Sequence, residues 1–183
     1  MIGLESLRWA LTCALAVATG FHLVRVLRPA GAGFVDEVLH LFMGGSMIAM
    51  IWPWGSGVPA GVWVTGFTLS TGWFVSRAIV ATGSRLAPIY FASATAAMLW
   101  MAATISTEKS EISDMAGMGH ATGAYPGWIS AALGAYLVAA ALWWTVRSMH
   151  LRPAGVAPQA PRWPEVCHAT MSAAMGLALL AMA

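Results

Sequence analysis

The sequence contains little charge. Lys, Arg, Asp and Glu together make up 9% of the 183 residues, whereas they make up about 25% of an ordinary soluble domain. The mean hydropathy of +0.73 leaves too little polar surface to cover a soluble fold. The net charge of +2 comes from scattered arginines without a basic block, which argues against nucleic acid as a partner. The composition therefore predicts a protein of the lipid bilayer.

Cysteine is also scarce, and enzymatic motifs are missing. Cys13 and Cys167 both lie in apolar stretches, so we expect no disulfide framework. The sequence has no nucleophile–base motif, no glycine-rich phosphate loop and no zinc-protease signature. We therefore expect no enzymatic activity. The first apolar segment lacks a basic n-region, so we interpret it as a retained helix.

Six apolar segments alternate with short stretches rich in proline, glycine and arginine. A bilayer crossing takes about 20 apolar residues in a helix, because backbone groups in lipid must bond within the segment. We expect a single domain over residues 1–183, an all-α polytopic bundle of six transmembrane helices in the plasma membrane. The predicted spans are residues 7–26, 37–54, 60–80, 86–105, 128–146 and 165–183.

The cationic residues predict the orientation of these helices. Most of them flank the first, third and fifth connections; they are Arg25, Arg28, Arg77, Arg85, Arg147, Arg152 and Arg162. Cationic loops stay on the cytoplasmic side of a membrane. Both termini should therefore lie outside, together with the acidic loop over residues 107–125.

Two of the predicted spans carry the same stripe of histidine and methionine. In the second span the stripe is His40, Met43, Met47 and Met50, preceded by Asp36. In the sixth span it is His168, Met171 and Met175, preceded by Glu165. At about 100° per residue, each set falls on one helix face. His22 lies near the cytoplasmic end of the first span, so we expect all three imidazoles at a similar depth.

Thioether and imidazole ligands together suit Cu(I). The outer loop adds Asp114, Met115, Met118 and His120, which could capture the ion before it reaches the stripes. The leading hypothesis is therefore a protein that binds or transfers copper, with Asp36 and Glu165 as supporting carboxylates. Its partners would include copper donor or acceptor proteins. The competing interpretation of each methionine is packing, because methionine fills irregular gaps well.

Two other functions fit the same residues. His22, His40 and His168 are candidate axial ligands of haem in a membrane electron carrier. The chain could also be a non-catalytic accessory subunit, with its methionine stripes packed against other subunits of a membrane complex. These alternatives stay open at the level of sequence.

The second-span run HLFMGGSMIAMIWPWG, residues 40–55, resembles a family of actinobacterial integral membrane proteins catalogued as a domain of unknown function. Residues 125–130 (YPGWIS) and 168–176 (HATMSAAMG) extend the resemblance over most of the chain. The resemblance implies a plasma-membrane protein with His/Met-rich helices and supplies no activity. The chain departs from the family pattern in its fourth span, where Tyr90, Met98 and Met101 occur without a histidine.

Overall fold

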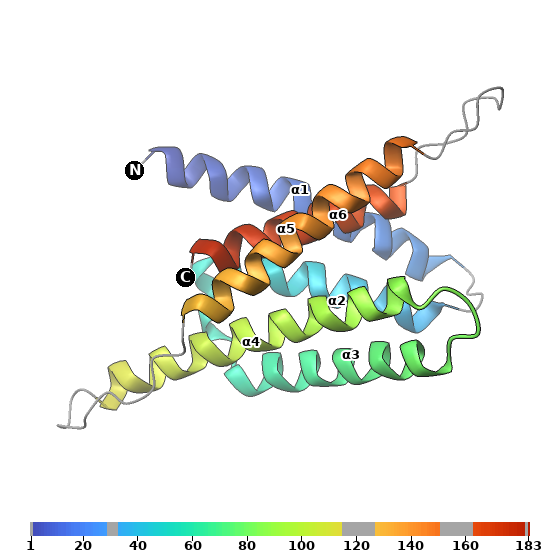
Figure 1. The fold of residues 1–183 in the computed structure, drawn as a ribbon. Coiled ribbons are helices and arrows are strands. Elements are labelled where there is room, and N and C mark those ends of the chain that lie inside the picture. Colours follow the sequence, from blue (N-terminus) through green and yellow to red (C-terminus); the bar gives the residue numbers. More distant parts are fainter. Residues whose placement is uncertain (1, 29–32, 115–126, 151–162, 182) are drawn as a thin grey trace. The chain divides into compact units, whose positions relative to one another are not determined.

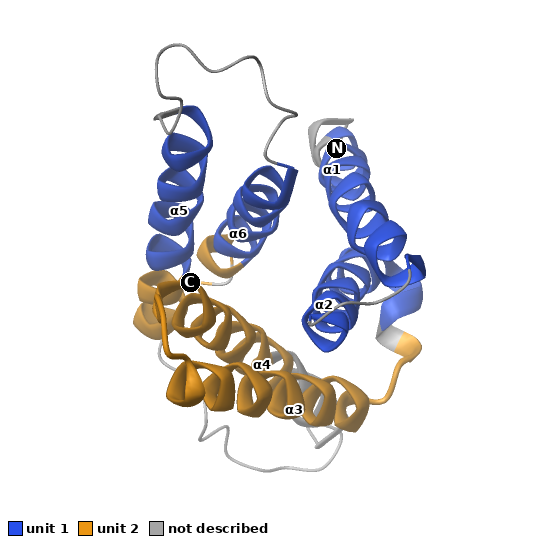
Figure 2. Cartoon of the chain, turned by 90° about the vertical axis from the view of Figure 1, so that its right-hand side faces the viewer, with its two compact units in different colours: residues 1–56, 134–178 blue, residues 57–133, 179–183 orange. Residues whose placement is uncertain are grey.

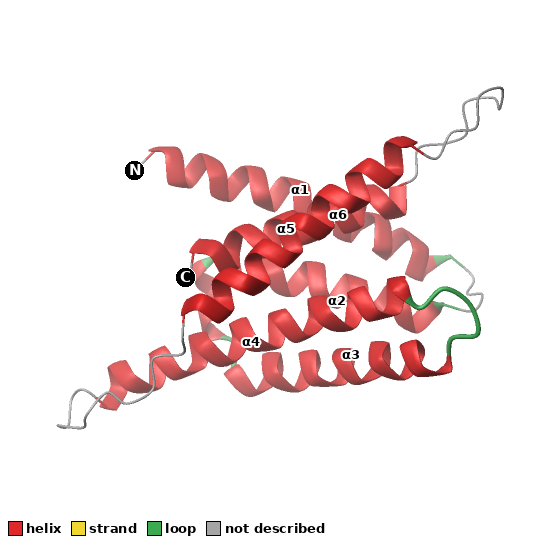
Figure 3. Cartoon of the chain, viewed as in Figure 1, coloured by secondary structure: helices red, strands yellow, loops and turns green. Residues whose placement is uncertain are grey.

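The computed structural model describes residues 2–28, 33–114, 127–150, 163–181 and 183, and these residues form helices without any strand (Figure 3). The helices are α1 (Ile2–Leu27), α2 (Phe34–Ile51), α3 (Ala60–Val80), α4 (Leu86–Asp114), α5 (Gly127–His150) and α6 (Trp163–Ala181) (Figure 1). A short 3-10 helix, Pro53–Gly57, follows α2. The prediction of an all-α fold with six helices is confirmed.

The second helix ends earlier than the sequence predicted. We expected it to reach residue 54, but α2 stops at Ile51 because Trp52 adopts an extended conformation and Pro53 follows. The chain then folds back closely on the helix end. A Cβ atom added at Gly55 would overlap the carbonyl of Ala49, so only glycine fits there. The run at residues 52–55 therefore lies beyond α2, at Trp52 and in the first residues of the 3-10 helix.

The fourth helix continues beyond the predicted span. We placed its end at residue 105 and an outer loop at residues 107–125, but α4 runs to Asp114. Residues 107–114 are therefore helical, which corrects the start of the loop. Polar residues end an apolar segment without ending the helix, because its backbone hydrogen bonds form equally in water. Met115, Met118 and His120 lie outside the described residues, and the structure does not describe the side chain of Asp114.

Four of the helices are long and apolar enough to cross a membrane. Their crossing segments are Arg8–Leu27, Phe34–Ile51, Leu86–Thr104 and Gly127–Met149. Two helices, α3 and α6, have a lower mean hydropathy. Glycine and hydroxyl residues lower it in α3, and Pro164, Glu165 and His168 lower it at the start of α6. Spanning by α3 and α6, like the orientation of the bundle, stays a prediction.

The chain divides into two compact units (Figure 2). Unit 1 comprises Met1–Ser56 and Gly134–Ala178, and therefore holds α1, α2 and most of α5 and α6. Unit 2 comprises Gly57–Leu133 and Leu179–Ala183, and holds α3, α4 and the first residues of α5. All the histidines singled out in the predicted spans belong to unit 1.

Unit 2 is built on the packing of α3 along α4. Phe67 and Phe74 are fully buried, and the Phe74 ring centroid lies 5.3 Å from that of Phe91. Thr71 donates a hydrogen bond to the carbonyl of Phe67 at 2.8 Å, and its hydroxyl lies 3.0 Å from that of Thr95 on α4. Apolar contact and a hydroxyl pair thus hold the two helices together.

Unit 1 begins with the hairpin of α1 and α2. Trp9 and Trp52 meet edge to face with ring centroids 4.8 Å apart. The indole nitrogen of Trp52 also donates a hydrogen bond to Thr12 Oγ1 at 3.0 Å. These contacts fix the hairpin at the end of the two helices that is remote from their connection. The connecting end carries the candidate site.

Candidate functional site

Three imidazoles from three helices of unit 1 lie next to one another. The ring centroids of His22 (α1) and His40 (α2) are 4.8 Å apart, and those of His40 and His168 (α6) are 5.0 Å apart. The third pair, His22 and His168, is separated by 5.9 Å. We call these three residues the histidine cluster. The first residues of the two stripes therefore face each other, which the sequence left open.

The orientation of His22 is fixed by a carboxylate. Its Nδ1 lies 2.7 Å from Glu37 Oε2, and the other oxygen, Oε1, accepts from Arg25 Nε at 2.7 Å. An ionised carboxylate only accepts hydrogen bonds, so Nδ1 of His22 carries the proton. In the neutral ring the lone pair then resides on Nε2.

His40 is oriented in the same way by its own helix. Its Nδ1 lies 2.6 Å from the backbone carbonyl oxygen of Asp36. A carbonyl is also only an acceptor, so Nδ1 of His40 carries the proton and Nε2 is the lone-pair nitrogen of the neutral ring. The two stacked imidazoles, with 16° between their planes, thus share one tautomer.

Buried polar atoms without a partner accompany the cluster. Nε2 of His22 and Oγ1 of Thr19, one helical turn away on α1, make no hydrogen bond within the described part of the chain. His22 is 2% exposed. Native proteins satisfy almost all buried polar atoms, so these two mark a place where a ligand would be stabilised.

One turn from the cluster, three helices approach closely at Gly44. A Cβ atom at Gly44 would overlap Thr19 Oγ1 on α1 and lie 3.0 Å from the Met171 methyl on α6. The methionines of both stripes are buried in this region apart from the half-buried Met50; the buried ones are Met43, Met47, Met171 and Met175. Thioethers therefore follow the imidazoles along the stripes of α2 and α6.

Trp144 of α5 lies beside His168. The two ring centroids lie 5.4 Å apart with 53° between the planes, and the Arg147 guanidinium lies 5.9 Å from the centre of the indole. Sequence reasoning missed this residue, because a tryptophan near a predicted span end suggests only an aromatic belt. No periodicity within α5 indicates which histidine it meets.

The carboxylate that contacts His22 is Glu37, which we did not select, and His40 bonds to the backbone carbonyl of Asp36. Support from the side chains of Asp36 and Glu165 stays a prediction. In an antiparallel hairpin, positions equally close to the connection face each other. His22 and Glu37 are both within about one and a half turns of it, which is the signal that could have identified this pair.

The donor set of the cluster fits a metal, but its rings do not yet converge. Imidazole nitrogen binds first-row metals at about 2.0 Å, so rings sharing one ion have centroids roughly 5 Å apart. The spacing in the cluster agrees with that value. The arrangement of the side chains does not yet suit an ion, because among the described residues no group of three His, Cys, Asp or Glu side chains could hold one. Binding would require the rings to turn toward a common point.

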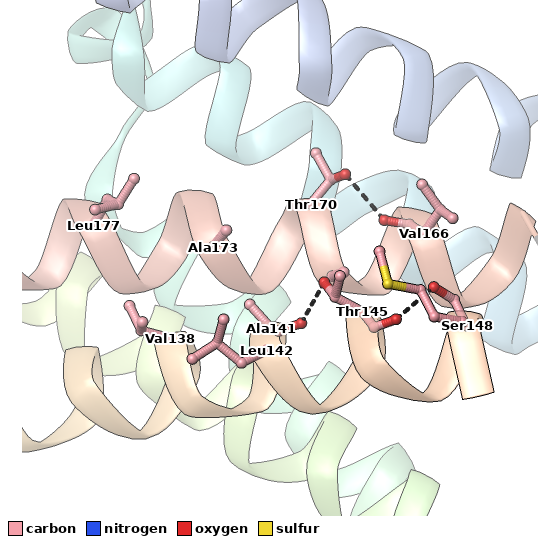
Figure 4. Close-up of a pocket in the computed structure, with 11 residues that line it drawn as sticks. Val138, Ala141, Leu142, Thr145, Ser148, Val166, Thr170, Ala173 and Leu177 are labelled. Carbon is pink, nitrogen blue, oxygen red and sulfur yellow. Dashed lines mark hydrogen bonds between the residues drawn. The ribbon is translucent and has the colours of Figure 1, made fainter.

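A separate groove of about 590 Å³ lies between α5 and α6 in unit 1 (Figure 4). It is mainly apolar, and the hydroxyls of Thr145 and Thr170 along it donate to carbonyls of their own helices. On α6 the groove is lined by Val166, Ala173 and other residues of the face that does not carry the stripe. The groove therefore does not belong to the histidine cluster.

No curated protein and no solved structure matches this chain. Residues 32–182 match the family described as Domain of unknown function (DUF5134). This stretch includes Glu37, His40 and His168, whereas His22 precedes it. The resemblance inferred from the sequence to a family of unknown function is thus confirmed, and the chain belongs to the DUF5134 family.

Proposed function

We propose that this chain is a plasma-membrane protein that binds Cu(I) at the histidine cluster and transfers it along the methionines of α2 and α6. One observation carries the proposal: three imidazoles from three helices adjoin one another at a buried place where Nε2 of His22 makes no hydrogen bond among the described residues. The outer residues Asp114, Met115, Met118 and His120 would capture the ion.

The hydrogen bonds of the cluster support a metal site. A histidine that binds a metal through one nitrogen usually donates its other N–H to a carboxylate or a backbone carbonyl. His22 donates to Glu37, and His40 donates to the carbonyl of Asp36. Both bonds turn Nε2 into the nitrogen that a metal would bind.

The neighbouring side chains favour Cu(I) over a harder ion. Thioethers prefer soft metals, and the methyl group of Met171 lies beside Gly44, one turn from His40. Neutral imidazole and thioether ligands add no charge to the apolar interior, where an uncompensated charge is costly. A monovalent ion held by neutral ligands keeps the net charge of the site low.

The geometry is less suited to haem. Two axial imidazoles lie on opposite faces of a porphyrin, with the iron between them. His22 and His40 are stacked with centroids 4.8 Å apart, which leaves no room for a porphyrin ring between them. Membership of a larger membrane complex is compatible with copper binding, so subunits or copper carriers that copurify would extend the proposal.

The test is Cu(I) binding by the protein purified in mild detergent under reducing conditions. We expect about one copper per chain, measured by elemental analysis and by competition with a chromophoric Cu(I) chelator. H22A, H40A and H168A should each weaken binding about 100-fold, or about 2.8 kcal/mol. The matched control H150A changes a histidine outside the cluster and should leave binding unchanged.

Equal copper affinity in the wild type and all three cluster variants would refute the proposal. The visible spectrum of the same preparation tests the alternative. A Soret band that disappears in H22A or H40A would support haem in place of copper.

A further inference from the structure

The two carboxylate oxygens of Glu37 accept hydrogen bonds from two different side chains. Oε2 accepts from His22 Nδ1 and Oε1 accepts from Arg25 Nε, both at 2.7 Å. The Glu37 side chain is 17% exposed, that of His22 3% and that of Arg25 45%. The Arg25 guanidinium also lies 5.7 Å from the Phe21 ring centre, which helps to hold it in place.

This arrangement requires a carboxylate. Arg25 Nε–H and His22 Nδ1–H are both donors, so the residue between them must accept twice. A glutamine at position 37 would offer one oxygen and one NH2 group, and the NH2 group would face one of the two donors. Glu37 therefore does more than fill space: it fixes the tautomer and the ring direction of His22.

The charge of Glu37 also affects which ion the site prefers. Coulomb energy grows with the charge of the ion, so an uncompensated carboxylate beside the cluster would favour a divalent over a monovalent metal. Arg25 offsets that charge. Further charged residues of the described helices that carry the cluster or contact it include Asp36 on α2, Glu165 on α6 and Arg147, which lies over Trp144.

We infer that the Glu37–Arg25 pair is the specificity determinant of the histidine cluster: Glu37 presents Nε2 of His22 to the metal, and Arg25 cancels the carboxylate charge so that a monovalent ion is preferred. This inference depends on the proposed function, since it names the class of ion that the same site takes. In it, Glu37 and Arg25 act through His22 and bind no metal themselves.

The experiment compares Cu(I) and Zn(II) affinities of the full chain in detergent. R25Q should raise the ratio of Zn(II) affinity to Cu(I) affinity about tenfold. A larger change is not expected, because Arg25 is half exposed and solvent screens its charge. R25K keeps the charge and should restore the wild-type ratio. The control R28Q removes the same charge from an exposed arginine and should leave the ratio unchanged.

E37Q should weaken Cu(I) binding about 10- to 100-fold, as changes of residues that orient a ligating histidine do. The ¹⁵N NMR spectrum of ¹⁵N-histidine-labelled protein reports the tautomer directly. It should show loss of the fixed Nδ1–H form of His22 in E37Q. The matched control D36N removes a neighbouring charge but keeps the carbonyl that binds His40, and should leave the His22 tautomer unchanged.

The outcomes separate this inference from the proposed function. Absence of Cu(I) binding by the wild type would refute the proposed function. Copper binding by the wild type, with an unchanged metal ratio in R25Q and an unchanged His22 tautomer in E37Q, would overturn the inference alone. If E37Q does not fold, the ratio in R25Q and its rescue in R25K still decide the role of the pair.

Discussion

Two buried polar atoms of unit 1 differ from the buried hydroxyls of unit 2. In unit 2, the hydroxyls of Ser70, Thr95 and Thr104 each donate to a carbonyl of their own helix. In unit 1, Thr19 Oγ1 and His22 Nε2 make no hydrogen bond among the described residues. Unit 1 also has buried hydroxyls of the same kind, since Ser46 and Ser172 donate to carbonyls of α2 and α6. The contrast is therefore between all these hydroxyls and the two polar atoms beside the histidine cluster.

The buried methionines of the two units differ in whether their helix also carries a histidine. Met98 and Met101 are buried in α4 of unit 2, a helix without histidine. Met171, equally buried, lies one turn from His168 in unit 1. A buried methionine alone therefore does not indicate a metal site. The neighbouring imidazoles distinguish the methionines of unit 1 chemically. Three pairs of matched variants follow: the first tests the packing beside the cluster, and the other two compare unit 1 with unit 2.

The largest effect is expected at Gly44. G44A places a methyl group against Thr19 and Met171, and overpacking of this kind costs about 1–3 kcal/mol. It should lower the thermal midpoint in detergent and also weaken Cu(I) binding, because α1 and α6 must move apart beside the cluster. The control G45A meets no atom within 4 Å and should be neutral or slightly stabilising. Equal midpoints for G44A and G45A would contradict the close approach of the three helices.

A smaller effect is expected when a methionine of the stripe becomes leucine. M171L keeps the volume of the side chain but removes the thioether, so Cu(I) affinity should fall about tenfold while stability changes by less than about 1.5 kcal/mol. M98L makes the same change in unit 2 and should not alter copper binding. Chelator competition measures both. Identical affinities in M171L and the wild type would assign Met171 to packing.

The smallest effect is expected at the two threonines. T95V removes hydroxyl bonds to Phe91 and Thr71 and should cost about 0.6 kcal/mol, the average for such bonds between membrane helices. T19V removes a hydroxyl that makes no hydrogen bond in the described structure and should leave the metal-free protein as stable or slightly more stable. The thermal midpoints of the metal-free wild type, T95V and T19V measure both changes in stability. A greater loss in T19V than in T95V would show that Thr19 already has a partner.

Sequence periodicity predicted much of this organisation. The number and type of the helices followed from apolar length, and the distribution of arginines led us to expect His22, His40 and His168 at one level. Their side-by-side rings agree with that expectation. The helical extension of α4 to Asp114 was missed, because hydropathy reports contact with lipid and not the backbone conformation.

The partners of the cluster were harder to predict. Asp36 falls on the stripe of α2, so periodicity selected it, but the residue that contacts His22 is Glu37, about 100° further round the helix. That contact depends on how α1 and α2 pair across their connection. Trp144 depends in the same way on the placement of α5 against α6. Contacts between helices set both residues, and a pattern within one helix cannot report them.

The position of His168 has a consequence for the order in which the protein is made. His22 and His40 belong to a local hairpin that can form soon after its synthesis, whereas α6 is translated much later. Contacts between residues so distant in sequence form late in folding. A growing or truncated chain would therefore offer two imidazoles at most and hold metal weakly. Under the proposed function, copper loading would then await a bundle that already contains α6, and the unfinished chain would be protected from capturing a reactive ion.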